Sequence, residues 1–101
     1  MNRHNIRCKC KTIILQIFLH LISRAALSIH LNIAEGASKK SKVERRRYYE
    51  ISRGSIVEVD AALDIASDLN YLNNIDMKDL AEKMVSTFKL LTGLILSCSK
   101  H

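Results

Sequence analysis

The chain contains no proline, and only three of its 101 residues are glycine. Proline and glycine interrupt helices and form most of the tight turns between strands. A β-sandwich or barrel of this length needs many such turns, so the sequence excludes those folds and favours long helices with few connections. Apolar residues make up 48% of the chain, which also excludes a disordered protein. A chain of this length forms one domain.

Apolar residues recur at helical spacing in three stretches. They predict helices at about 12–36, 42–72 and 76–98, which together form an all-α, antiparallel up-down helical bundle over residues 12–101. The stretch before them, residues 1–11, is polar and basic without periodicity, and we expect a flexible arm there.

Residues that favour helix ends lie between these stretches. Gly36 is expected to end the first helix in the left-handed conformation. Ser41 and Glu44 have the spacing of a capping box at the start of the second helix. Asn73 and Asn74 are expected to end that helix, and Asp76 to cap the third.

The first helix is apolar on more than one side, and the last turns of the third are apolar nearly all round. A small monomer cannot cover such helices, so a homo-oligomer is predicted. The predicted oligomer interface consists of Ile14, Phe18, Ile22, Leu91, Leu94 and Ile95. His20 and Arg24 interrupt the apolar run of the first helix, so we expect no membrane span and a cytoplasmic protein.

Positive charge is concentrated around the predicted turn between the first two helices. The chain has a formal net charge of +6, and residues 39–53 hold seven basic residues against Glu44 and Glu50. Such a density attracts phosphates, and Tyr48 and Tyr49 are candidates for stacking on unpaired bases, although Tyr48 is also expected in the core. Docking of a protein partner and a solvated charged face are the alternatives. The candidate nucleic-acid-binding residues are Lys39, Lys40, Lys42, Arg45, Arg46, Arg47 and Arg53.

No arrangement of residues predicts an enzyme. Ser23, Ser28, His20 and His30 lack the nucleophile elbow or orienting third group that catalysis would require. Asp60, Asp64 and Asp68 form one acidic stripe, which is either solvated or docked against the basic half of a neighbouring subunit.

The cysteines do not form a recognisable metal or disulfide framework. Cys8 and Cys10 form one tight pair with no second pair, and Cys98 stands alone. We therefore expect reduced thiols, no metal site and no cofactor.

The segment Arg24–Gly36, with the sequence RAALSIHLNIAEG, resembles the signature of the ribosomal RNA intervening-sequence proteins, a bacterial four-helix-bundle family. Ser41–Glu44, Tyr48, Ile51–Glu58 and Asp68–Leu72 continue the resemblance, which covers about residues 23–98. It implies an up-down bundle that assembles into a homopentameric ring and has no catalytic activity. The accessory variability determinant of diversity-generating retroelements is similar, which implies a reverse transcriptase as a further partner.

Two features depart from this family's pattern. Only about twenty residues precede the matching segment and do not match the family's first helix, and His30 occupies a position where the family usually has proline. We therefore expect three helices, with the first helix of the family fold truncated or altered. The predicted function is non-enzymatic binding of nucleic acid, RNA in particular, with a structural or scaffolding role as the alternative.

Overall fold

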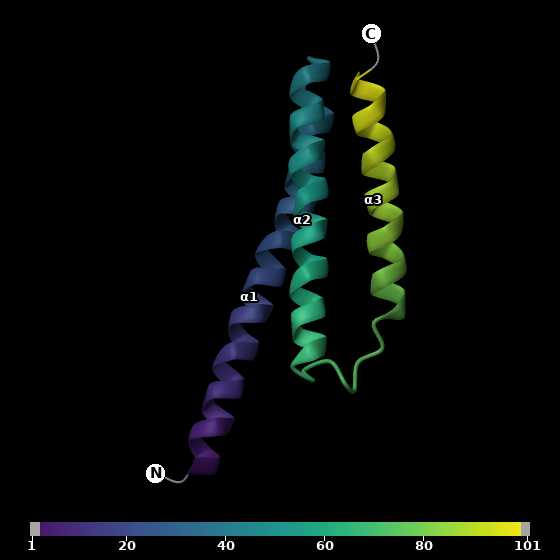
Figure 1. The fold of residues 1–101 in the computed structure, drawn as a ribbon. Coiled ribbons are helices and arrows are strands. Elements are labelled where there is room, and N and C mark those ends of the chain that lie inside the picture. Colours follow the sequence, from purple (N-terminus) through teal and green to yellow (C-terminus); the bar gives the residue numbers. More distant parts are fainter. Residues whose placement is uncertain (1–2, 100–101) are drawn as a thin grey trace.

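The structure is a computed structural model that describes the backbone of residues 3–99 and the side chains of residues 9–99. Its helices are α1 (Arg3–Ser38), α2 (Lys42–Asp68) and α3 (Lys78–Ser99). Both α1 and α3 pack along α2, and successive helices run in opposite directions (Figure 1). No strand occurs between residues 3 and 99, so the predicted all-α fold with three long helices is confirmed.

The first helix begins earlier than expected. Residues 3–11, predicted as part of a flexible arm, belong to α1, and residues 1–2 of that arm lie outside the described residues. No proline or glycine precedes Gly36, so no helix-breaking residue stops α1 from starting this early. As a result, α1 is 36 residues long.

The first helix also continues past Gly36, which we expected to end it. The prediction of a left-handed glycine is wrong, because no glycine in the described part of the chain has a positive φ. The helix ends at Ser38, whose hydroxyl donates a hydrogen bond to the Glu35 carbonyl at 2.7 Å. The backbone N–H of Lys39 then donates to the Gly36 carbonyl at 3.2 Å and closes the turn.

The second helix begins as its capping sequence predicts. Ser41 is the N-cap residue in an extended conformation, and its Oγ accepts a hydrogen bond from the Glu44 N–H at 3.4 Å. This bond satisfies one of the amides that lack a helical partner at the start of α2.

The second helix ends at Asp68, four residues before the predicted boundary at 72. Asn70 has a φ of 63° and is the one non-glycine residue with positive φ among those described. Its backbone N–H donates a hydrogen bond to the Ser67 carbonyl, and the N–H of Tyr71 donates to the Ala66 carbonyl, both at 3.0 Å. This pair of bonds is a Schellman motif in which Asn70 takes the place of the usual glycine.

The third helix begins two residues later than expected, at Lys78. Asp76 nevertheless provides a capping bond, because its Oδ1 accepts a hydrogen bond from the Lys78 N–H at 3.0 Å.

The hydrophobic core lies between α2 and α3. Tyr49, Ile56, Leu91 and Ile95 form its buried centre, and the half-buried Ile29 and Ile33 of α1 pack against it. Polar side chains join α1 to α2 in the same region: Ser52 Oγ donates to the Ile29 carbonyl at 2.9 Å, and Ser55 Oγ donates to Ser28 Oγ at 3.0 Å.

The molecule is long and thin, with extents of 64 × 24 × 15 Å. Its radius of gyration is 17.4 Å, whereas a compact domain of this length has about 13 Å. Its smallest dimension only slightly exceeds the diameter of one helix, about 10–12 Å. The helices therefore form little more than a single layer, and the amino-terminal end of α1 extends beyond the α2–α3 loop (Figure 1).

The Lys9–Ser38 part of α1 is long and apolar enough to cross a membrane, with a mean hydropathy of 1.7. Only 6% of its most apolar stretch is buried inside the structure. The interruption of the apolar run by His20 and Arg24 therefore does not by itself exclude a membrane span. A core helix of a soluble protein and a signal sequence meet the same criteria, so this feature alone does not define a location.

Candidate nucleic-acid interface

Six of the predicted nucleic-acid-binding residues gather at the turn between α1 and α2 and on the first two turns of α2. This end of α2 lies beside the carboxyl end of α3 (Figure 1). The positive end of the α2 dipole lies at the same place and adds to the attraction for anions. We call this cluster the basic corner: Lys39, Lys40, Lys42, Arg45, Arg46 and Arg47.

Two members of the basic corner are held by the turn itself. The Lys39 ammonium lies 3.6 Å from a Glu35 carboxylate oxygen and 5.4 Å from the centroid of the Tyr48 ring. Arg45 Nε donates a short hydrogen bond to the Lys39 carbonyl oxygen. These contacts brace the turn, and both side chains are half-buried.

The other four members are exposed. Lys40, Lys42 and Arg47 are open to solvent, as is Arg46, whose Nε lies 2.8 Å from Glu50 Oε1. A surface ion pair of this kind contributes little, about 0–1 kcal/mol. A phosphate can therefore compete with Glu50 for Arg46 at low cost.

Arg53 lies apart from the basic corner and belongs to the packing of the bundle. Its Nη1 donates a hydrogen bond to Thr92 Oγ1 of α3 at 3.2 Å, and its guanidinium lies 5.6 Å from the centroid of the Phe88 ring. Its role in nucleic-acid binding stays a prediction, and in this structure its charge is directed to α3. The sequence places it one helical turn beyond Glu50 but cannot reveal the packing of α3.

The two tyrosines have the reverse of their expected positions. Tyr49 is buried in the core, and Tyr48 is half-buried beneath the Lys39 ammonium. Of the two rings, Tyr48 is therefore the more accessible to a base.

The predicted oligomer interface divides into exposed and buried residues. Ile14 is exposed, and Ile22 and Leu94 are half-buried. Phe18 makes an edge-to-face contact with Tyr71, with centroids 6.2 Å apart. The assignment of Leu91 and Ile95 to an interface is wrong, because both are buried in the core of one chain.

An exposed apolar stripe on α1 lies outside the predicted oligomer interface. Ile13, Ile17, Leu27 and Leu31 are each more than half exposed. Their spacing, which alternates between four and three residues when His20 and Arg24 are included, would have revealed the stripe.

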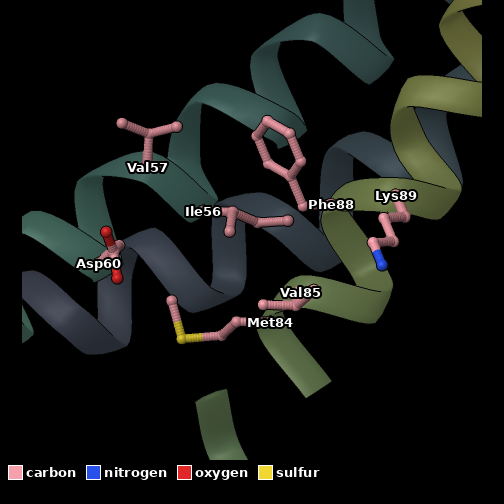
Figure 2. Close-up of a pocket in the computed structure, with 7 residues that line it drawn as sticks. All are labelled: Ile56, Val57, Asp60, Met84, Val85, Phe88 and Lys89. Carbon is pink, nitrogen blue, oxygen red and sulfur yellow. The ribbon is translucent and has the colours of Figure 1, made fainter. Parts of the chain in front are cut away.

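A concave surface lies between α2 and α3 (Figure 2). Ile56, Val57 and Asp60 of α2 face Met84, Val85, Phe88 and Lys89 of α3 around a hollow of about 270 Å³. The lining is apolar except for Asp60 and Lys89, and it holds no pairing of a nucleophile with a base. The hollow is therefore suited to an apolar side chain of a binding partner.

The candidate catalytic and metal-binding residues are not assembled into a site in the described part of the chain. Ser28 Oγ accepts hydrogen bonds from Ser55 and from Asn32, both at 3.0 Å, so its role is structural. No group of three His, Cys, Asp or Glu side chains with metal-binding geometry is found among residues 9–99. Cys10 and Cys98 are free thiols, whereas the side chain of Cys8 lies outside the described residues.

Comparison with protein families found that the family described as 23S rRNA-intervening sequence protein matches residues 15–93. Comparisons with curated proteins and with solved structures found no match. The matched segment includes most of α1, all of α2, the basic corner and most of α3. The chain therefore belongs to the 23S rRNA-intervening sequence protein family.

Proposed function

We propose that this small helical protein is a non-enzymatic RNA-binding protein that acts as an oligomer. The observation that carries the proposal is the set of exposed cations in the basic corner, Lys40, Lys42, Arg46 and Arg47, on a braced turn. The Ser41 cap and the bond from Arg45 to the Lys39 carbonyl hold the backbone of this turn. A backbone that is already held in place loses little further conformational freedom when the side chains on it bind phosphates.

The charge balance supports a polyanionic ligand. Residues 39–53 contain seven basic and two acidic residues, whereas residues 54–101 contain four basic and seven acidic residues. A ligand with regularly spaced phosphates would therefore be drawn to the basic corner and repelled from the rest of α2 and α3. The name of the family refers to 23S rRNA, and for that reason we propose RNA as the nucleic acid.

The oligomeric part of the proposal is supported by the exposed apolar residues. Eight large apolar residues of α1 between Ile13 and Leu31 are exposed, in a molecule only 15 Å thick. Exposed apolar surface of this extent marks an interaction site in soluble proteins.

Fluorescence anisotropy with a labelled RNA hairpin that has a single-stranded loop tests the RNA-binding proposal. The double variant Arg46→Glu/Arg47→Glu should bind much more weakly, and the slope of log K against log salt concentration should be shallower by about 1.4. The matched control is Lys78→Glu/Lys83→Glu, which changes the net charge equally at the opposite end of α2 and α3. The control should retain most of the affinity.

Equal loss of affinity in both double variants would show an effect of net charge alone and would contradict a site at the basic corner. If the wild-type protein has no affinity for the hairpin at low salt, the basic corner instead serves to dock a protein, such as a reverse transcriptase, or to solvate the surface. That outcome would favour the scaffolding function.

A further inference from the structure

The exposed apolar stripe of α1 has the pattern of a coiled-coil face. Phe18, Ala25 and Ile29, on the other side of the helix, are directed toward the rest of the chain and are buried or half-buried. The apolar residues of the stripe face away from them, and Arg24 lies at the edge of the stripe nearest α2. The residues of the stripe alternate in steps of four and three, the spacing with which helices pack against one another. We call it the outer seam: Ile13, Ile17, His20, Arg24, Leu27 and Leu31.

A long apolar groove runs between α2 and α3. The hollow in Figure 2 adjoins a second hollow, and both are lined by Asp60, Met84 and Val85. Together they form one groove, which we call the α2–α3 groove. The second hollow adds Leu63, Asp64, Ser67, Leu72, Ile75, Met77 and Ala81.

The outer seam and the α2–α3 groove are complementary in polarity. The seam has apolar residues at both ends and two polar residues, His20 and Arg24, at its centre. The groove has apolar residues toward both ends, with Lys89 beside Phe88 at one of them, and the carboxylates of Asp60 and Asp64 lie between the ends. An arginine at the centre of the seam would thus meet two acidic residues at the centre of the groove.

The seam is longer than the part of the groove that lies on α2. From Ile13 to Leu31 the seam covers 19 helical residues, or about 27 Å. The groove follows α2 from Ile56 to Ser67, or about 17 Å, and its lining then continues to Leu72 and Ile75 of the α2–α3 loop.

We propose that the outer seam of one copy of this chain packs into the α2–α3 groove of a second copy, with Arg24 facing Asp60 and Asp64. The seam cannot reach the groove of its own chain. The opposite side of α1 is tied to α2 by the bond from Ser52 to the Ile29 carbonyl and by the bond between Ser55 and Ser28. Because the surfaces that meet are different, each copy keeps one free seam and one free groove, and assembly continues into a ring or an open chain.

The position of Arg24 favours a second copy over a lipid bilayer. A charged side chain in the middle of a membrane-spanning helix is unfavourable, whereas the α2–α3 groove offers carboxylates at the corresponding place. Arg24 also lines a hollow between α1 and α2 together with Glu58 of its own chain, so Glu58 is the competing acidic residue. This inference rests on the oligomeric part of the proposed function and is independent of RNA binding.

Size-exclusion chromatography with light scattering tests the proposal through charge swaps. The wild-type protein should have a mass above the 11.5 kDa of one chain. Both Arg24→Glu and the double variant Asp60→Lys/Asp64→Lys should shift the mass toward that of one chain. A mixture of the two variants should regain the larger mass, because the intact seam of the second variant fits the intact groove of the first.

Glu58→Lys is the control for added positive charge on α2. It lies outside the groove and changes the charge by +2, whereas the double variant changes it by +4. It should not lower the mass, because it removes the acidic residue that competes for Arg24. Circular dichroism should show unchanged helix content in every variant. If both variants retain their helix content and their mixture stays at the mass of one chain, the proposal is overturned.

Two other outcomes would also overturn it. If Arg24→Glu leaves the larger mass unchanged, like seams pack against each other, because facing glutamates repel each other as facing arginines do. If the wild-type protein stays at the mass of one chain and sediments with vesicles of phosphatidylcholine and phosphatidylglycerol, the occupant is a membrane. RNA binding measured separately on the Arg24→Glu variant distinguishes a failure of this assembly from a failure of the proposed RNA site.

Discussion

Gly36 of α1 lies directly against the ring of Tyr49 of α2. A Cβ atom added to Gly36 would lie 2.7 Å from Tyr49 Cε1 and 2.9 Å from Cδ1, closer than two carbon atoms can approach. Since Tyr49 is buried in the core, its ring has little room to move. The glycine is therefore required for the close approach of the two helices and not for the left-handed conformation that its position in the sequence predicts.

Gly36→Ala should destabilise the protein. Overpacking of a well-filled site costs about 1–3 kcal/mol, and the higher helix propensity of alanine returns only about 1 kcal/mol. We expect a net decrease of about 1 kcal/mol in the free energy of unfolding. Urea denaturation followed by circular dichroism, at one fixed protein concentration, measures this change. An increase in stability would show that the Tyr49 ring can move aside.

Gly54→Ala is the matched substitution with the opposite expected sign. Gly54 is also helical, but an added Cβ would meet no other atom within 4 Å. The gain in helix propensity should raise the free energy of unfolding by about 1 kcal/mol. If Gly54→Ala instead lowers stability, or blocks association in light scattering, the exposed face around Gly54 is in contact with another copy.

The start of α2 was predictable from sequence because its signal is local. Ser41 and Glu44 form a bond between residues three apart, and such a bond needs no knowledge of the rest of the chain. The end of the same helix was missed, because the apolar residues Leu69 and Leu72 on either side of Asn70 continue the helical pattern and only its φ of 63° shows the break. Asparagine adopts this conformation often enough to end a helix, but glycine is the more recognisable signal.

The candidate site was predictable only in part, for a similar reason. The density of cations in the basic corner is a property of the sequence, whereas the direction of each side chain depends on the packing of helices far apart in the chain. Arg53 is directed to Thr92, 39 residues away. Tyr48 and Tyr49 are neighbours on one helix, and only the position of α1 and α3 determines which ring is buried. Periodicity identifies an apolar face but not its partner.

Asn70→Gly and Asn70→Val together test the end of α2. Glycine adopts a positive φ without strain, so Asn70→Gly should leave stability unchanged or raise it slightly. A β-branched residue in this conformation is strained, and we expect Asn70→Val to lower the free energy of unfolding by about 1–2 kcal/mol. Thermal denaturation of both variants gives the comparison. Equal stability of the two variants would contradict the Schellman motif at this position.

Arg53 and Thr92 should be coupled in stability and uninvolved in RNA binding. The hydrogen bond between them and the position of the guanidinium over Phe88 connect α2 to α3. A double-mutant cycle with Arg53→Met and Thr92→Val should give a coupling energy of about 0.5–1.5 kcal/mol in urea denaturation. Arg53→Met should leave the affinity for the RNA hairpin nearly unchanged, whereas Arg47→Met, which removes the same charge from the basic corner, should reduce it. A reduction of equal size in both variants would return Arg53 to the RNA interface and would mean that its contact with α3 is exchanged for a phosphate when RNA binds.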